Sequence, residues 1–302
     1  MRILVTGASG LLGSAMVKVF QNKFNVFATS KSDCLGYRPK NFKRFNLQET
    51  SYFELLNWAK PDIIVHNAAI TNLDFCEKNE DLAFEVNAHS LKKFLSYSQD
   101  IKIIFISSDA VFPSKSSMSK ENDVLGPINV YGLSKLKAEE ILIKSEINYT
   151  IIRTTIVGLN DNIKNDNFVS WIIKSAMSGK KITLFNDAVF NPISVWDLIR
   201  ELEFTILEEM DEVLHISGSE TISKYEFGKK ICSHLNLNSN FISSGSIKDF
   251  NFLARRSLDQ TLDCSLYEKI SGRKLPNVKD TIKSITKFYR SGLDEQFQNW
   301  ER

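Results

Sequence analysis

Two places in this chain carry a tyrosine followed four residues later by a lysine, a spacing that puts both side chains on one face of a helix. Tyr131 and Lys135 lie in "NVYGLSKLKAEE", and Tyr225 and Lys229 lie in "YEFGK". A tyrosine phenol, with a pKa of about 10, can give a proton to an alkoxide. A neighbouring ammonium group stabilises the phenolate and lowers that pKa toward the working pH. Spacing alone does not separate such a pair from a packed tyrosine beside a solvated lysine.

The sequence before the first pair favours it as the chemical one. The apolar run "IKIIFIS" (101–107) predicts a buried strand, and Ser107, Ser108 and Asp109 stand at its end. Ligands of open α/β sheets bind beyond the carboxyl ends of the strands. Tyr131 follows Ser108 by 23 residues, at the start of the next predicted helix. The second pair has no such strand before it, and we interpret it as structural.

These residue types suit the reduction of a carbonyl group by a nicotinamide cofactor. We predict that Tyr131 gives the proton to the new alkoxide, and that Lys135 lowers the pKa of the phenol while binding the cofactor ribose. Ser108 would hydrogen-bond the substrate oxygen and orient it. Ser108, Tyr131 and Lys135 are therefore the predicted catalytic residues. The charged residues at 137–140, on the same helix, are interpreted as a solvated face.

Short apolar runs alternate with amphipathic stretches through the first half of the chain. Buried strands are predicted at 3–5, 25–29, 62–66, 101–107 and 149–157, with helices at 11–23 and 87–99. Strands that alternate with helices indicate a doubly wound parallel α/β sheet. Residues 1–158 are predicted to form a dinucleotide-binding Rossmann domain. Residues 159–302 are predicted to form mainly a smaller substrate-binding lobe that exchanges elements with the first domain.

The first predicted strand runs into a glycine-rich loop, "TGASGLLG". Gly7 permits a sharp turn, Gly10 lets the backbone approach a pyrophosphate at a helix N-terminus, and Gly13 allows close packing of helix on strand. The spacing is G-x-x-G-x-x-G rather than the G-x-G-x-x-G of the standard dinucleotide fingerprint. Because the loop follows the first strand of an α/β pattern, we interpret it as a cofactor phosphate site rather than a structural turn.

The end of the second predicted strand indicates which cofactor binds. An acidic residue there would hold the ribose hydroxyls of NAD, whereas this chain has "ATSKS", with Ser30 and Lys31. Hydroxyl groups and a cation suit a 2′-phosphate, which favours NADPH. A solvated loop lysine is the alternative interpretation of Lys31, so the use of NADH stays open.

The composition is that of an ordinary globular protein of 302 residues, with 43% apolar and 25% charged residues. A formal net charge of +2 implies no bulk attraction to nucleic acid or membrane. The four cysteines form no C-x-x-C pair, and the four histidines lack metal-ligand spacing. We therefore expect no metal site and a reducing, cytoplasmic location. We also expect no signal peptide and no membrane span.

The motifs together resemble the extended short-chain dehydrogenase/reductase superfamily, and within it the dTDP-4-dehydrorhamnose reductase family. The resemblance covers nearly the whole chain and rests on ordered segments, namely "TGASGLLG", "PDIIVHNAAITNLDFCE", "EVNA", "SSDAVF", "NVYGLSK", "IIRT", "NPISVWDL" and "RRSLDQTLDCS". It implies reduction of a nucleotide-linked 4-keto-6-deoxy sugar. It also implies a homodimer, because many members of the superfamily form dimers.

The resemblance assigns roles to individual residues as well. Ser108, Tyr131 and Lys135 match the catalytic triad of the family, and Asp109 would help to bind or protonate the sugar. The implied substrate contacts are Ser108, Asp109, Tyr131, Asn191 and Arg256. The implied cofactor contacts are Gly7, Ser9, Gly10, Leu11, Leu12, Ser30, Lys31, Asn46, Leu47, Ala68, Ala69, Ile70, Tyr131 and Lys135.

Two departures from the family pattern fall on the substrate side. The family often has Ser-Trp after "RT", where this chain has Thr155 and Ile156, and it commonly has proline after the late arginine, where this chain has Ser257. These differences leave the cofactor residues intact but put the rhamnose precursor in question as the substrate. Asn46 replaces an aspartate that relatives usually carry near the adenine, and an amide can make the same hydrogen bonds.

Two alternative functions remain open. The first is a sugar-nucleotide dehydratase or epimerase with retained NAD. Dehydratases usually carry an acid pair where this chain has Asp109 and Ala110, so dehydration is disfavoured, and epimerisation is less easily excluded. The second is a regulatory subunit that keeps the fold without turnover, like the non-catalytic subunit of methionine adenosyltransferase. The intact Ser108, Tyr131 and Lys135 argue against it.

Overall fold

A seven-stranded parallel sheet forms the larger part of the computed structural model, which describes residues 1–34, 39–49, 51–97, 100–159 and 167–293. The strands are β1 (Arg2–Thr6), β2 (Asn25–Ser30), β3 (Asn41–Arg44), β4 (Ile63–His66), β5 (Lys102–Ile106), β6 (Tyr149–Arg153) and β11 (Val213–His215). Their order is β11-β6-β5-β4-β1-β2-β3, so the chain reverses direction across the sheet between β1 and β4. In open α/β sheets, ligands bind beyond the strand ends at such a reversal.

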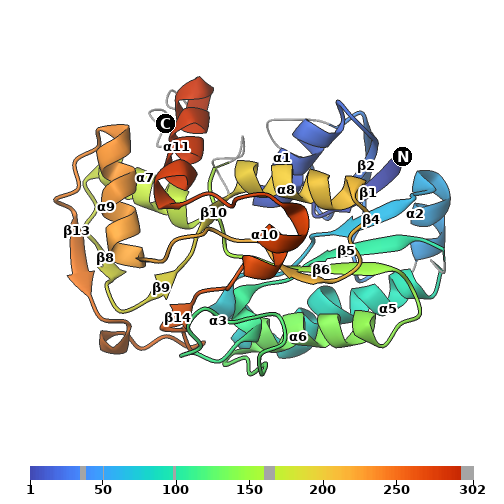
Figure 1. The fold of residues 1–302 in the computed structure, drawn as a ribbon, viewed down its shortest axis with the longest axis horizontal. Helices are drawn as coiled ribbons and strands as arrows, with labels where there is room; N and C mark the ends of the chain where they lie inside the picture. Colours follow the sequence, from blue (N-terminus) through green and yellow to red (C-terminus); the bar gives the residue numbers. More distant parts are fainter. Residues whose placement is uncertain (35–38, 50, 98–99, 160–166, 294–302) are drawn as a thin grey trace.

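Helices cover both faces of this sheet (Figure 1). One face carries α1 (Leu11–Phe20) and α8 (Val195–Leu207), and the other carries α2 (Tyr52–Ala59), α5 (Ser90–Leu95) and α6 (Val130–Ile143). Successive residues of a strand point to opposite faces. Ile3 and Val5 of β1 therefore pack with α1 and α8, whereas Leu4 packs with α2, α5 and α6. The predicted doubly wound α/β sheet is confirmed.

A second, smaller lobe has a core of its own. It contains the helices α7 (Phe168–Ser178), α9 (Lys224–Leu235) and α11 (Val278–Phe288) and the strands β8 (Ile182–Phe185) and β13 (Ile242–Gly245), which pair in parallel. Phe190, Phe227 and Ile282 are fully buried in this core. The lobe stands at the left of Figure 1, to one side of the main sheet.

Short elements complete the described part of the chain. The strands among them are β7 (Ile156–Val157), β9 (Val189–Phe190), β10 (Ile193–Ser194), β12 (Ile222–Ser223) and β14 (Asp259–Gln260). The helices among them are α3 (Leu73–Lys78), α4 (Glu80–Phe84) and α10 (Ser265–Ser271), with 3₁₀ turns at Asp109–Val111 and Ile247–Asp249 and π-helical turns at Glu85–His89 and Tyr289–Leu293. Within the described ranges, every helix is too short or too polar to span a bilayer.

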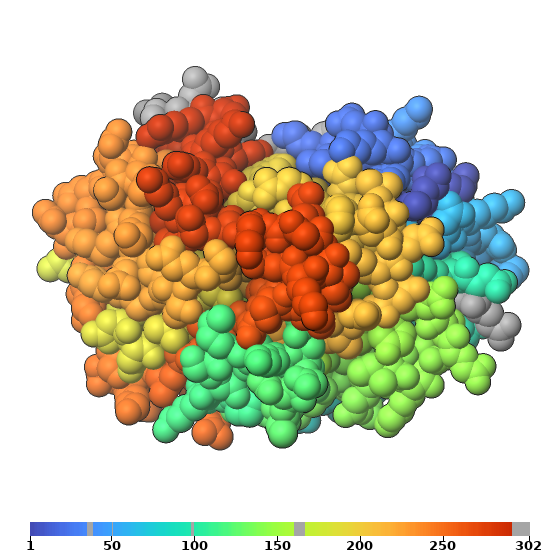
Figure 2. Space-filling view, viewed as in Figure 1, coloured from blue at the N-terminus to red at the C-terminus, as the bar shows by residue number. Residues whose placement is uncertain are grey.

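The second half of the chain contributes to both lobes. The elements α8 and β11 follow residue 158 in sequence and yet belong to the main sheet, where β11 pairs with β6. In the space-filling view the C-terminal residues, orange to red, run across the middle of the molecule between the lobes (Figure 2). The division of the chain at residue 158 stays a prediction.

Two elements differ from those expected. The single strand predicted at 149–157 is two strands, β6 and β7, with Thr154 and Thr155 between them. The strand β3 had no apolar run to indicate it, because it lies at the edge of the sheet with no fully buried side chain.

Candidate active site

Tyr131 lies in the first turn of α6, and the start of this helix is fixed by side-chain contacts. Asn129 is the N-cap, and its Oδ1 accepts a hydrogen bond from the N–H of Gly132 at 2.9 Å. A Cβ on Gly132 would lie 2.3 Å from the carbonyl oxygen of Ala110, so glycine permits the helix to approach the turn after β5. This close approach puts Tyr131 within hydrogen-bonding reach of Ser108.

Ser108 and Asp109 form a hydrogen-bonded group at the end of β5. The Ser108 hydroxyl donates to Asp109 Oδ1 at 2.7 Å, and the Thr155 hydroxyl donates to Asp109 Oδ2 at 3.1 Å. Burial raises the pKa of Asp109, while the Ser108 hydrogen bond, the charge of Lys224 and the Thr155 hydrogen bond oppose that rise. The predicted catalytic serine is therefore coupled directly to a buried carboxyl group.

Lys135 is buried one helical turn after Tyr131, and its ammonium group contacts the strand beneath the helix. Its Nζ donates to the carbonyl oxygen of Ile106 at 2.6 Å and lies 4.0 Å from the ring centroid of Phe105. Burial lowers the pKa of Lys135 to about 7, and the charge of Glu139 opposes this lowering. The lysine is thus in the predicted place but only weakly favours its charged form at neutral pH.

The pKa of Tyr131 is raised in the structure, whereas the sequence predicted that Lys135 would lower it. Burial makes the largest contribution to the rise, a hydrogen bond with Ser108 opposes it, and the charge of Asp109 adds to it. The cost of desolvating a phenolate outweighs the influence of a lysine that is itself desolvated. The phenol therefore keeps its proton, which is the form that a proton donor requires.

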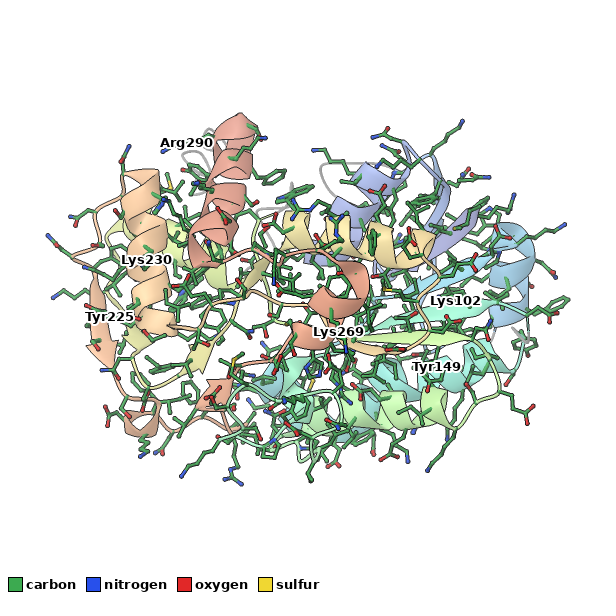
Figure 3. All side chains as sticks on the ribbon, in the orientation of Figure 1. Lys102, Tyr149, Tyr225, Lys230, Lys269 and Arg290 are labelled. Atoms are coloured by element: carbon green, nitrogen blue, oxygen red, sulfur yellow. The ribbon has the colours of Figure 1, made fainter. Side chains whose placement is uncertain are left out.

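The second tyrosine–lysine pair does not line the cavity that contains Ser108, Tyr131 and Lys135. Tyr225 packs against the core of the second lobe from α9, and Lys229 lies one turn further along the same helix. Figure 3 shows Tyr225 on the second lobe, at the left of the molecule, whereas the main sheet that carries Tyr149 lies at the right. This placement supports a structural role for the pair.

The glycine loop and the start of α1 form a cradle of backbone atoms. Gly7 has a φ of +69°, a left-handed conformation, and a Cβ there would lie 2.8 Å from the Cα of Ala68. A Cβ on Gly13 would lie 2.2 Å from the carbonyl oxygen of Gly7, so α1 packs directly on the loop. Gly10 is the N-cap and places no side chain over the helix end. Backbone N–H groups and the helix dipole attract phosphate there, so the cradle fits a dinucleotide pyrophosphate.

The loop after β2 is tied to this cradle. The Ser32 hydroxyl donates to Ser9 Oγ at 3.2 Å. Ser30 is buried and Lys31 is exposed, and both line the same cavity as the glycine loop. The loop after β2 and the glycine loop therefore line the same end of one cavity.

One cavity, of about 1040 Å³, joins the glycine cradle to the predicted catalytic residues. It is lined by Asp109 and by every residue predicted to contact the cofactor or to act in catalysis, namely Gly7, Ser9, Gly10, Leu11, Leu12, Ser30, Lys31, Asn46, Leu47, Ala68, Ala69, Ile70, Ser108, Tyr131 and Lys135. Asn191 and Arg256 do not line it. Across the ranges that the structure describes, no cluster of histidine, cysteine and acidic side chains could hold a metal ion.

Asn191 links backbone segments instead of facing the cavity. Its Nδ2 donates to the carbonyl oxygens of Gly218 at 2.7 Å and Leu262 at 2.8 Å, and its Oδ1 accepts from the N–H of Leu262 at 3.1 Å. Both amide protons are used inside the protein, at a site that is 1% exposed. The structure thus gives Asn191 a positioning role and does not bring it to the predicted substrate site.

Arg256 is held by the first lobe. Its Nη2 donates to Asp74 Oδ2 at 2.9 Å, and its guanidinium group lies 4.9 Å from the ring centroid of Phe252. Asp74 Oδ1 also accepts from the N–H of Ala254 at 3.0 Å. Arg256 therefore anchors the segment 254–256 to α3, outside the cavity.

The cavity has further lining residues that the sequence analysis did not assign to it. Those from the segment after β6, from the second lobe and from β14 are Thr154, Thr155, Ile156, Asn167, Lys224 and Gln260. Thr155 had one signal, its place directly after "IIRT". No motif marks Lys224, because its position depends on how the second lobe packs beside the sheet.

A buried ion pair links α6 to β6. Glu139 is 0% exposed and accepts hydrogen bonds from Arg153 Nη2 at 2.7 Å and from Arg153 Nε at 3.1 and 3.2 Å. The Ser107 hydroxyl donates to the same carboxylate. The interpretation of residues 137–140 as a solvated face is therefore wrong for Glu139, because β6 brings Arg153 beneath the helix.

The chain is similar to known proteins in both sequence and structure. The chain is 26% identical over 295 residues to the probable low-salt glycan biosynthesis reductase Agl14 of Haloferax volcanii, covering 94% of this chain and 97% of the relative. It is 29% identical over 286 residues to methionine adenosyltransferase 2 subunit beta of Pongo abelii, covering 91% and 84%.

The fold is similar to that of dTDP-4-dehydrorhamnose reductase from Bacillus anthracis in complex with NADP. The TM-score is 0.84 and the identity 25%, with 94% of this chain and 98% of that chain covered. A family model described as the RmlD substrate binding domain matches residues 1–291. This agreement confirms the resemblance seen in the sequence, and the chain belongs to the RmlD substrate binding domain family.

Proposed function

We propose that this protein is an NAD(P)H-dependent reductase of a nucleotide-linked sugar, of the 4-keto-6-deoxy class that the resemblance implies. The observation that carries the proposal is the single cavity in which the glycine cradle and Ser108, Tyr131 and Lys135 face the same space. The Bacillus anthracis relative is a dTDP-4-dehydrorhamnose reductase and the Haloferax volcanii relative is a probable reductase, which supports the reaction class.

The cavity walls fit a nicotinamide dinucleotide along their length. The backbone of the glycine loop would hold the pyrophosphate, with Asn46 and Leu47 toward the adenosine half and residues 68–70 along the cofactor. Ser30 and Lys31 favour NADPH over NADH, because a cation and a hydroxyl group suit a 2′-phosphate. When bound, the cofactor supplies the hydride.

The chain's own residues supply the proton and orient the substrate. Tyr131, which burial keeps protonated, donates its phenolic proton to the oxygen atom that becomes the product hydroxyl. Ser108 hydrogen-bonds the same oxygen atom and fixes the direction of the carbonyl group. Lys135, one turn below, stabilises the charge that Tyr131 acquires when it gives up its proton.

We assign the sugar to the part of the cavity between Asp109 and the second lobe. Thr155, Asn167, Lys224 and Gln260 line this part and offer both hydrogen-bond donors and acceptors. Residues 159–302 would then act mainly in binding the substrate, as the sequence predicted. Ile156 lines the cavity where the family often has tryptophan.

The reaction can be tested with a panel of nucleotide-linked 4-keto-6-deoxy sugars. Purified protein is mixed with NADPH or NADH and each sugar, and oxidation of the cofactor is followed by absorbance. We expect oxidation with at least one sugar, and a product heavier than the substrate by two hydrogen atoms. If no member of the panel causes oxidation of either cofactor, the proposal is contradicted.

Replacing Tyr131 by phenylalanine tests its role as the proton donor. The Tyr131→Phe variant keeps the ring and its packing but loses the acidic proton, so kcat should fall by roughly a hundredfold or more. The affinity for NADPH, measured by fluorescence titration, should change little. A variant that turns over at the wild-type rate would exclude Tyr131 as the proton donor.

Similarity to methionine adenosyltransferase 2 subunit beta favours a second candidate function. In this case the chain would bind a partner enzyme and regulate it without turning over a substrate. The same Tyr131→Phe change, introduced in the source cells, separates the two candidates. The regulatory candidate requires the cellular role to survive the change, whereas the reductase candidate requires it to be lost.

A further inference from the structure

Lys224 reaches the catalytic end of the cavity from the second lobe. It is the first residue of α9, and the N-cap Ser223 holds the helix start by accepting from the N–H of Glu226 at 3.1 Å. Its Nζ lies 3.4 Å from the ring centroid of Phe190 and 5.2 Å from that of Phe168. The two rings hold the ammonium group in place, and its side chain lines the cavity.

At this end of the cavity, the charge of Lys224 interacts with that of Asp109. Among the described residues that line the cavity, Asp109 is the only carboxylate. Two titratable side chains interact with its charge, namely Tyr131 from α6 and Lys224 from α9. Burial lowers the pKa of Lys224 to about 8 and Asp109 opposes this lowering, so the ammonium form prevails at neutral pH. Lys224 and Asp109 therefore interact electrostatically at the same cavity, one from each lobe.

Ser108 has one hydroxyl proton, and Asp109 competes with a substrate for it. In this structure the proton is donated to Asp109 Oδ1 at 2.7 Å. A substrate oxygen can receive the same proton only if other groups satisfy the carboxylate. Thr155 satisfies Oδ2, and Lys224 supplies the balancing positive charge.

We propose that Lys224 is a positioning residue that neutralises Asp109 from the second lobe and thereby releases the proton of Ser108 toward the substrate oxygen. The catalytic part of this inference rests on the proposed reductase function. The pairing of the two charges does not, and it can be measured without any substrate. Loss of Lys224 should leave Asp109 either protonated or, at higher pH, charged and holding Ser108.

The pairing is tested by the titration of Asp109 in the full-length protein. Aspartate carboxyl carbons are labelled with ¹³C, and the Asp109 signal is assigned by its loss in Asp109→Asn. We expect the Asp109 midpoint to rise by roughly one unit or more in Lys224→Met and to stay near the wild-type value in Lys224→Arg. Lys230→Met, on the exposed side of the same helix, is the matched control and should leave it unchanged.

The catalytic role is tested by a double-mutant cycle with kcat as the readout. Lys224→Met should lower kcat by about tenfold at pH values above the Asp109 midpoint, recover activity below it, and leave the KM for NADPH unchanged. In the Asp109→Asn background, which has no charge to neutralise, the same change should alter kcat by less than about twofold.

Two results would overturn the proposal. One is an Asp109 midpoint that is the same in Lys224→Met and the wild type. The other is an equal loss of kcat in the wild-type and Asp109→Asn backgrounds, which would mean that Lys224 acts independently of Asp109. If no sugar is reduced by the wild-type protein, the reductase function fails by itself, and the titration alone then decides whether the charge pair exists.

Discussion

Tyr131 and Lys135 illustrate, at the scale of single residues, how burial changes the behaviour of a titratable pair. Their spacing predicted a lysine that makes the tyrosine more acidic. In the structure both groups are desolvated, which raises the pKa of the phenol and lowers that of the ammonium group. Desolvation disfavours the charged form of each group and makes the largest contribution to both shifts. The raised pKa therefore keeps the proton on the tyrosine at neutral pH.

The pH dependence of the free energy of unfolding should show the effect of burying Lys135. Its pKa is about 7 in the folded protein, against roughly 10.4 for an exposed lysine. Between these values the unfolded state binds more protons, so this group makes the free energy of unfolding rise with pH by about 1.4 kcal/mol per pH unit. Its destabilising effect is fully present below about pH 7.

Lys135→Met removes this pH dependence. We expect the variant to gain free energy of unfolding relative to the wild type near pH 6, and to lose that advantage as the pH rises toward about 9. Urea unfolding at each pH measures the difference, and the lost hydrogen bond to Ile106 affects all pH values alike. An advantage that does not vary with pH would show that Lys135 stays charged in the folded protein.

If Lys31 binds the 2′-phosphate as proposed, it sets the preference for NADPH over NADH. Lys31→Ala removes the cation that would pair with a 2′-phosphate, a contact typically worth about 1.5–3 kcal/mol. The dissociation constant for NADPH should therefore increase about tenfold or more, while that for NADH stays within about twofold. Isothermal titration with both cofactors measures the ratio. Equal weakening of both would assign Lys31 to a part of the cofactor that the two share.

At the scale of elements, α6 combines Tyr131, the proposed proton donor, with a buried ion pair. Its first turn is brought to Ser108 by Gly132, and its third turn is tied to β6 by Glu139 and Arg153. A helix that is anchored at both places holds Tyr131 in a fixed position relative to the strand ends. The pair thus links the packing of the helix to the geometry of the site.

Glu139→Ala should be strongly destabilising. Removing one partner leaves the Arg153 charge buried and unpaired, which costs about 3–5 kcal/mol. Chemical denaturation of the variant should show this loss. Glu140→Ala is the matched control, because the neighbouring residue is half exposed and pairs with the half-exposed Lys137, so its loss should be below about 1 kcal/mol. Similar losses in the two variants would contradict the structural role of the buried pair.

At the scale of the whole molecule, one segment of the C-terminal third connects the lobes. Residues 254–256 are held to α3 by Asp74, and Asn129, the N-cap of α6, donates to the carbonyl oxygen of Arg255 at 3.0 Å. Gln260, further along this segment, lines the cavity. The helices α3 and α6 therefore hold the segment that contributes Gln260 to the cavity wall.

Asp74→Ala should loosen this connection without unfolding the protein. The Asp74 side chain is 41% exposed, so the ion pair contributes at most about 1 kcal/mol to stability. We expect the KM for the nucleotide sugar to rise severalfold while the affinity for NADPH stays constant. Asp81→Ala, an exposed aspartate on α4, serves as the control. A change in cofactor affinity instead would place the segment's effect at the other end of the cavity.

The assembly of the protein is a separate question at this scale. A homodimer is implied by the family resemblance and stays a prediction. Sedimentation velocity over a range of protein concentrations would decide it.

The sequence by itself determined the sheet and the glycine cradle, and it predicted catalytic residues that the structure brings to the same cavity. These features depend on local patterns, namely apolar strands, glycines after the first strand, and hydroxyl groups at strand ends, and each pattern has a direct structural meaning. The parallel topology then brings all the strand ends together, which is why residues as distant as Gly7 and Tyr131 line one cavity.

Only the tertiary structure decided the second-lobe side of the site. Asn191 and Arg256 lie in family motifs and yet bind backbone groups and Asp74, whereas Lys224 lies in no motif and reaches the cavity. Likewise, the sequence pattern around Glu139 is that of a surface residue, whereas in the structure Glu139 is buried in an ion pair with Arg153. Such positions depend on contacts between segments far apart in the chain. The burial that sets the pKa values of Asp109, Tyr131 and Lys135 arises in the same way.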